Sequence, residues 1–431
     1  MRHASVLLEG ADLIDGSAGP VIRDATVLIE GERIKYAGPR KRFADERIER
    51  LDLSGKTLIP GLIEAHTHAA FDADMLAYVK NGITTIRFAG LDQNDVARLR
   101  QRVEHGELIG PRILSCGPMI DQPPPAYPEW SVAVSTPAEA AATAERLIAR
   151  DNVEYLIVTQ RVTVPVMAAV VRAAHAHGRT VVAQTWAVDG KEAAELGIDE
   201  LHNSSRVYVS RDYPKKRLLN YESIADRLAM SGRAWATIDW DATRSIMAAM
   251  VDKGVPYCGM QVMGHFQQGI GVTELETDAD FLTLFGKPER DAFFGFIKKL
   301  QGSWTPDDLE HWRVANENRM EWMRRFRALG GDLLVGTDMQ FGGITLHQEL
   351  RNIAALGVSP MEVIAMATSG NARALRINGK LGRIAEGLLA DIVVLNRDPT
   401  NDLGALRDIA CVFRDGAMAW SDPSRSWPAR A

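Results

Sequence analysis

The feature that most constrains the fold is an alternation of strand-like and helix-like segments, repeated eight times between residues 57 and 378. Each repeat begins with a short apolar run and continues with helical periodicity. Thr136-Pro137 and Ser359-Pro360 place a capping residue before a proline, as at a helix start. Strands are expected near residues 58, 85, 112, 154, 180, 198, 255 and 332. This order predicts an α/β fold, a (β/α)8 TIM-like barrel.

The two ends of the chain have a different pattern. Residues 1–56 contain short alternating segments separated by Gly, Asp and Pro, and "GRIAEGLLADIVVLN" and "CVFRDGAMAW" continue this pattern near the C-terminus. Such segments are typical of β-strands. We therefore expect residues 1–56 and 379–431 to meet as a small flanking β-sandwich domain, beside a catalytic barrel formed by residues 57–378.

Composition and charge exclude several classes of protein. The net charge of −6 argues against a nucleic-acid surface, which needs clustered Lys and Arg. No apolar run approaches the roughly 18 residues of a membrane span, and "MRHASVLLEGADLIDG" predicts a first strand rather than a signal peptide. The three cysteines are far apart and form no CxxC motif. That pattern fits a reducing compartment, so we expect a cytoplasmic protein.

Barrels of this type carry their catalytic residues at the C-terminal ends of the strands. The first strand ends in "EAHTH", and residues two apart on a strand point the same way, so His66 and His68 can bind one metal. Asp338 follows the eighth strand, where it can be a metal ligand and a proton acceptor or, alternatively, a turn residue. His202 ends the sixth strand and can bind the metal or hydrogen-bond the substrate.

Several motifs resemble the amidohydrolase superfamily, and within it the imidazolonepropionase/prolidase-like group. They are "PGLIEAHTH", "GITTIRFAG", "GIDELH", "LLVGTD", "HQELRNIAALGVSPMEVIAMATSGNARAL" and "GKLGRIAEGLLADIVVL". The resemblance implies a metal-dependent hydrolase that cleaves a C–N bond, and commonly a homo-oligomer. It also implies six metal ligands: the HxH pair, a carboxylated lysine on the fourth strand, a histidine on the fifth, another on the sixth, and an aspartate on the eighth. His66, His68, His202 and Asp338 match this set.

The chain departs from that set on two strands. Ile157 stands where the family places the lysine, and Gln184 stands where it places the fifth-strand histidine. Isoleucine cannot coordinate a cation, and a glutamine oxygen is a poorer zinc ligand than imidazole. Two cations without a bridging negative charge would repel each other. We therefore expect one divalent metal ion, zinc, held by His66, His68 and Asp338, with His202 as a fourth ligand or a substrate contact.

Other polar and aromatic residues follow the strands and are candidates for substrate binding. The candidates are Gln184, Trp186, Gln160, His265 in the long connection of residues 259–306, and Tyr127 in the loop "DQPPPAYPEW", which also contains Trp130. Each has a plainer alternative in packing or as a loop residue. Connections as long as 259–306 are often functional lids.

The leading hypothesis is hydrolysis of an amide, lactam or peptide-like bond in a small molecule, and Trp186, Tyr127 and Trp130 suggest that this molecule has an apolar or aromatic part. Asp338 would take the proton of the attacking water and deliver it to the leaving nitrogen, and His202 would stabilise the oxyanion. Two alternatives remain open. One is a metal-poor or metal-free enzyme with acid–base lyase, isomerase or decarboxylase chemistry, and the other is a non-catalytic binding protein on the same scaffold.

Overall fold

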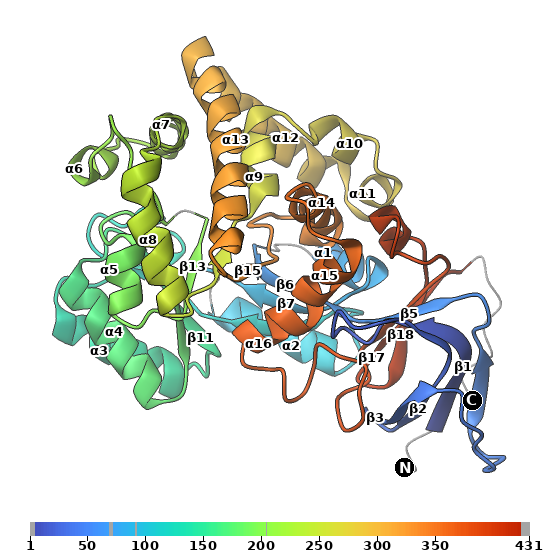
Figure 1. The fold of residues 1–431 in the computed structure, drawn as a ribbon. Coiled ribbons are helices and arrows are strands. Elements are labelled where there is room, and N and C mark those ends of the chain that lie inside the picture. Colours follow the sequence, from blue (N-terminus) through green and yellow to red (C-terminus); the bar gives the residue numbers. More distant parts are fainter. Residues whose placement is uncertain (1–4, 69–71, 91–92, 204, 424–431) are drawn as a thin grey trace.

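A computed structural model describes residues 5–68, 72–90, 93–203 and 205–423. A barrel surrounded by helices occupies the centre, and a sheet made from both chain ends lies beside it (Figure 1). The eight barrel strands are β6 (Leu62–Thr67), β7 (Ile83–Phe88), β8 (Arg112–Ser115), β11 (Tyr155–Gln160), β12 (Thr180–Thr185), β13 (Glu200–His202), β14 (Tyr257–Cys258) and β15 (Leu333–Leu334).

These strands are parallel, and backbone hydrogen bonds close them into a ring. The order is β6-β7-β8 in one sheet and β11 to β15 in another. Glu154 N donates to Ser115 O over 3.0 Å between β8 and β11, and Ala65 N donates to Val335 O over 3.0 Å between β6 and β15. The predicted (β/α)8 barrel is confirmed.

Helices cover the barrel and begin where the sequence signals them. Thr136 accepts a hydrogen bond from Glu139 N, and Ser359 forms a capping box with Glu362. The covering helices are α1 (Asp72–Lys80), α2 (Gln93–Glu104), α3 (Pro137–Ala149), α4 (Val164–Ala176), α5 (Gly190–Glu195), α8 (Trp240–Asp252), α13 (Pro306–Ala328), α14 (Gly342–Ala354), α15 (Pro360–Ala365), a π-helical turn at Met366–Gly370 and α16 (Asn371–Ala374).

Both chain ends meet in the flanking sheet, as expected. Its strands are β1 (Ser5–Leu13), β2 (Ile22–Glu30), β3 (Arg33–Pro39), β4 (Glu49–Asp52), β5 (Thr57–Pro60), β16 (Ile392–Leu395), β17 (Ile409–Arg414) and β18 (Ala417–Ser421). They form one hydrogen-bonded sheet, ordered β18-β17-β16-β5-β1-β2-β3 with β4 beside β1, rather than two sheets of a sandwich. A 3-10 turn at Leu403–Arg407 joins β16 to β17.

The boundary between sheet and barrel differs from the predicted position at residue 57. The apolar run "TLIPGLI" is two strands, because β5 pairs with β1 and β16 in the flanking sheet and β6 opens the barrel. Gly61 lies between them, and a Cβ at this position would lie 2.1 Å from Thr84 Oγ1. The close approach explains why the chain passes from one layer to the other at a glycine.

Three excursions extend from the C-terminal ends of the barrel strands. The loop after β8 contains β9 (Met119–Asp121) and β10 (Ser131–Ala133), and the one after β13 contains α6 (Lys215–Leu218) and α7 (Ile224–Ala236). The connection of residues 259–306 folds as the helices α9 (Gln261–Gln268), α10 (Val272–Glu276), α11 (Ala279–Leu284) and α12 (Lys287–Gly302) (Figure 1). These helices pack around an apolar cluster rich in phenylalanine. No helix within the described ranges has the length and apolar character to cross a membrane.

Candidate metal centre

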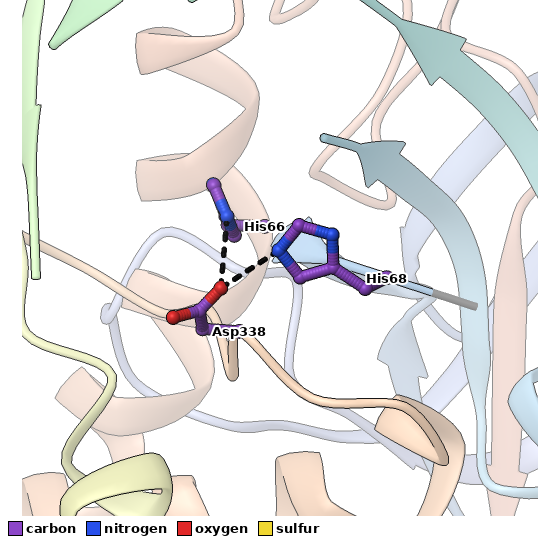
Figure 2. A group of neighbouring side chains, drawn as sticks. All are labelled: His66, His68 and Asp338. Carbon is purple, nitrogen blue, oxygen red and sulfur yellow. Dashed lines mark hydrogen bonds and ion pairs between the residues drawn. The ribbon is translucent and has the colours of Figure 1, made fainter. Parts of the chain in front are cut away.

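His66, His68 and Asp338 converge at the C-terminal end of the barrel (Figure 2). Asp338 Oδ1 lies 2.8 Å from His68 Nε2 and 3.2 Å from His66 Nε2. The backbone prepares this contact, since Asp338 N donates to His66 O over 2.9 Å. Asp338 also has a φ of 57°, a left-handed conformation that is uncommon outside glycine and is often found at functional sites.

The charge states of these groups suit a metal. Burial lowers the pKa of His66 to about 3, so the ring is neutral. Burial alone would raise the pKa of Asp338, but close contact with the imidazoles of His66 and His68 holds it well below its ordinary value, so the carboxylate is ionised. Neutral imidazoles and an ionised carboxylate are the forms in which these side chains bind cations.

His66 Nε2 is buried and has no hydrogen-bond partner among the described residues. Its Nδ1 lies 2.9 Å from His202 Nδ1, and His202 Nε2 lies 3.0 Å from Glu200 Oε2. Both bonds form together when His66 donates through Nδ1 and His202 donates through Nε2. His66 Nε2 then presents a lone pair to Asp338 Oδ1, which is unfavourable unless a cation lies between them. The donor set therefore fits a divalent metal.

His202 departs from its expected role as a ligand or substrate contact. Its side chain is fully buried, outside the group of three donors, and both ring nitrogens face protein atoms. Arg87 forms two hydrogen bonds to Glu200, of 2.8 and 2.5 Å, and its Nη2 is also 3.2 Å from His202 Nε2. We infer that His202 orients His66, and that Glu200 and Arg87 orient His202.

Glu64 joins the two strands that carry the three donors. Its Oε1 accepts the N–H of His66 on β6 and the N–H of Thr337 after β15, both over 3.0 Å. Burial raises the pKa of Glu64 to about 8. The side chain therefore fixes the first strand against the eighth, next to the candidate metal ligands.

Comparisons with known proteins agree with this fold. The amidohydrolase family model matches residues 311–419, and the chain is 42% identical over 64 residues to the imidazolonepropionase of Cereibacter sphaeroides. That stretch covers 15% of this chain and only 16% of the relative. The fold matches a putative prolidase from Bifidobacterium longum over 100% of this chain and 97% of that one, with a TM-score of 0.71 and 24% identity. It also matches a bottromycin amidohydrolase over 96% of this chain and 86% of that one, with a TM-score of 0.76 and 20% identity.

The chain is thus similar in sequence to the amidohydrolase family over residues 311–419, and it shares the fold of these solved structures over nearly its whole length. Members of the amidohydrolase family are generally metal-dependent, and this chain brings together three donors that could hold a metal.

The two departures from the family's ligand set have different surroundings. Ile157 is fully buried in an apolar cluster that includes Tyr155 and Val182. Gln184 is 5% exposed, and its side-chain amide makes no hydrogen bond to the described residues, so it is available to a substrate. Gln160, expected as a substrate contact, is fully buried and donates to Gln184 O over 2.9 Å. This bond gives Gln160 a structural role, joining β11 to β12.

Aromatic side chains line one side of the metal centre. Trp130 stacks on the His68 ring at 5.3 Å, and Tyr127 stacks on Trp130 at 5.9 Å. Asp121 holds their loop in place, accepting hydrogen bonds from Ala126 N and Arg161 N over 2.9 Å each. The predicted substrate loop thus lies against one of the three candidate metal ligands.

Trp186 and His265 lie further out. Trp186 is 2% exposed and makes an edge contact with Tyr221, so it packs under the excursion after β13. His265 is half-buried on α9, and burial together with the charge of Arg319 lowers its pKa to about 4. The structure shows no contact between His265 and the three metal donors, and a substrate role for it stays a prediction.

A cavity of about 710 Å³ opens at the opposite end of the barrel. Thr180, Val255 and Leu333, at the beginnings of barrel strands, are among its lining residues. None of the predicted site residues lines it. In this fold, residues at the N-terminal end of the barrel serve stability rather than catalysis.

Two features of the site are absent from the sequence-based prediction. Glu200 could have been found, because it lies two residues before His202 on one strand and so shares its face. Arg227, on α7, makes its contacts with Tyr127 and Trp186 only through tertiary folding, and no motif marks it.

Proposed function

We propose that this protein is a metal-dependent hydrolase that cleaves C–N bonds in small molecules. The observation that carries the proposal is the convergence of His66, His68 and Asp338 where barrel enzymes place their catalytic residues. The similar proteins give further support, since they include an imidazolonepropionase, a putative prolidase and an amidohydrolase. Two imidazoles and a carboxylate suit zinc.

We further propose a single metal ion. In place of the lysine that would bridge two ions, the chain has Ile157 in an apolar cluster. A second cation at His202 would also face the Arg87 guanidinium, which lies 3.2 Å from the ring nitrogen. A divalent ion about 4 Å from a unit positive charge costs about 8 kcal/mol at an effective dielectric constant of 20. Glu200 would offset little of this electrostatic cost, because its negative charge is already paired with Arg87.

The roles of the residues follow from their contacts. A bound metal would supply Lewis-acid polarisation of the scissile carbonyl and of water. Asp338, ionised and facing both imidazoles, would accept the water proton and pass it to the leaving nitrogen as the C–N bond breaks. The free amide of Gln184 would orient the substrate. We expected His202 to stabilise the oxyanion, but both of its ring nitrogens contact protein groups, so we do not assign it that role.

Metal analysis and an Asp338 variant test this function. We expect about one zinc per chain, and amide or lactam hydrolysis that is lost on chelation and restored by zinc, manganese or iron. Asp338→Asn should abolish turnover and keep the fold, because asparagine also tolerates a left-handed backbone. Asp24→Asn is the matched control, since Asp24 also has a positive φ (49°) but is exposed in the flanking sheet.

Three outcomes would contradict the proposal. Full activity of Asp338→Asn removes the proton-transfer role. Full activity without metal favours acid–base lyase, isomerase or decarboxylase chemistry. Absence of turnover by the metal-loaded protein on amides, lactams and lactones favours a binding protein.

A further inference from the structure

The cavity of about 710 Å³ at the N-terminal end of the barrel has a positively charged lining. Its charged lining residues are Lys253, Arg327, Arg373, Arg376, Asp199 and Asp332. Four of these side chains are cations and two are carboxylates, so the lining carries a net charge of +2, in a chain whose net charge is −6. Cations that converge on one cavity repel one another unless an anion lies between them.

The four cations come from three helix ends that meet at the cavity. Lys253 is the C-cap residue of α8, and Arg327 lies in the last turn of α13. Arg373 lies on α16, and Arg376 follows the C-cap residue of that helix. A helix dipole favours a cation at a helix C-terminus, but α16 has only four residues and brings two. The helix dipoles alone therefore do not account for the cluster.

The backbone of Arg376 gives an independent indication. Its φ is 55°, in the left-handed region. Ile377 N donates to Ala372 O over 2.9 Å and Arg376 N donates to Arg373 O over 3.1 Å, which is the hydrogen-bond pattern of a Schellman motif. Glycine is the usual residue at this position of the motif, because a Cβ is strained there. An arginine at a position that suits glycine indicates a use for its side chain.

The two arginines of this segment differ in how firmly they are paired. Arg376 Nη2 donates to Asp199 Oδ1 over 2.6 Å. Arg373 makes no side-chain hydrogen bond to the described residues, and its Nη2 lies 3.7 Å from Asp332 Oδ2. Both Arg373 and Asp332 are mostly exposed, at 64% and 73% of the side chain. The guanidinium of Arg373 therefore has N–H donors available to a ligand.

The cations on the other helices are also held loosely. Arg327 Nη2 lies 3.5 Å from Glu362 Oε1, and Lys253 Nζ lies 3.3 Å from Asp252 Oδ2. Neither carboxylate lines the cavity. Exposed pairs of this kind contribute little to stability, so an anion in the cavity can compete with them for the two cations.

We propose that this cavity binds a small multivalent anion, such as a phosphate ester or a polycarboxylate. Arginine binds phosphate and carboxylate groups through parallel N–H donors, and three arginines with one lysine can share the charges of a single ligand. The volume lies within the range of small-molecule sites, roughly 300–1,000 Å³. The proposal does not depend on the hydrolase function, because none of the three metal donors lines the cavity.

Calorimetry on the zinc-loaded protein tests the proposal, with inorganic pyrophosphate and citrate as the two probes. We expect binding that weakens as the salt concentration rises from about 50 to 200 mM. Arg373→Gln should weaken it about fivefold, and Arg373→Gln/Arg376→Gly about 25-fold. Glycine suits the left-handed backbone at residue 376, so the double variant should fold. Zinc also binds both probes, but that heat is common to all variants, because the substitutions lie at the other end of the barrel.

Two further variants separate a specific site from general attraction to positive charge. Arg324→Gln is the matched control, since Arg324 lies one turn before Arg327 on α13 and is 44% exposed but does not line the cavity. It should leave the affinity unchanged. Asp332→Asn should tighten binding about threefold, because it removes a negative charge from the lining and frees Arg373.

The outcomes decide the proposal without any measurement of amide hydrolysis. Binding of either probe that falls in the double variant supports it, and the tighter probe tells phosphate from carboxylate. It is overturned if neither probe binds, if the double variant binds as tightly as the wild type, or if Arg324→Gln weakens binding as much as Arg373→Gln. If the double variant does not fold, unchanged affinity in both Arg373→Gln and Asp332→Asn still overturns it.

Discussion

Arg87 and Glu200 form a buried ion pair that should stabilise the fold only when both residues are present. Either residue alone would leave a buried charge uncompensated and lower the free energy of unfolding. Both side chains are 1% exposed, and two hydrogen bonds of 2.8 and 2.5 Å join them. Burial alone would raise the pKa of Glu200, but Arg87 lowers it to about 2, so the pair is fully ionised. Arg87→Met leaves a buried carboxylate with only His202 beside it. Glu200→Gln leaves a buried guanidinium. Each change should lower the free energy of unfolding by about 3–5 kcal/mol.

The double variant Arg87→Met/Glu200→Gln leaves no buried charge, so its loss should be at least about 3 kcal/mol smaller than the sum of the two single losses. Urea unfolding, followed by circular dichroism and by tryptophan fluorescence, measures all three. Arg102 and Asp72 form the control, because they also make two hydrogen bonds, of 2.7 and 2.6 Å, but are 36% and 56% exposed. Their coupling should stay below about 1 kcal/mol. A coupling for Arg87 and Glu200 no larger than this would refute the argument.

Two further predictions concern packing and protonation. Gly61→Ala should lower the free energy of unfolding by about 1–3 kcal/mol, because the new Cβ meets Thr84 Oγ1 at 2.1 Å. Adding Thr84→Ala should recover most of that loss in urea unfolding, and additive losses would contradict the cause. His265 has a folded pKa of about 4 against an ordinary 6.5, so protons bind more readily to the unfolded chain. The free energy of unfolding should therefore fall by roughly 3 kcal/mol more in the wild type than in His265→Gln between pH 6.5 and 4. His105→Gln, at an exposed site, should follow the wild type, and parallel curves for wild type and His265→Gln would refute the assignment.

The sequence predicts the architecture well because local signals and the global fold agree. Strand and helix periodicities alternate without interruption, and the caps at Thr136 and Ser359 are present in the structure. The passage between sheet and barrel is harder to locate. The sequence is apolar on both sides of Gly61, because both strands are buried. The periodicity of hydrophobic residues therefore does not show where the strand of the flanking sheet ends and the first barrel strand begins.

The candidate site was predictable only where strand geometry fixes a direction. His66 and His68 had to point the same way, and Asp338 had to follow the eighth strand. His202 lies at its predicted strand end. The contacts of its ring nitrogens, however, depend on Glu200 and on Arg87, which comes from another strand. Such partners come from tertiary packing, which a single sequence does not encode in any short motif.

The changes at the metal centre form a consistent electrostatic arrangement. Ile157 lies where the resemblance implies a bridging lysine and offers no negative charge to hold two cations together, and the Arg87 guanidinium lies beside the histidine that a second cation would use. With one metal ion, only Asp338 offsets its charge among the three donors. A second divalent ion would add two positive charges beside a group of donors with a single negative charge, and this is the electrostatic reason for proposing one metal ion.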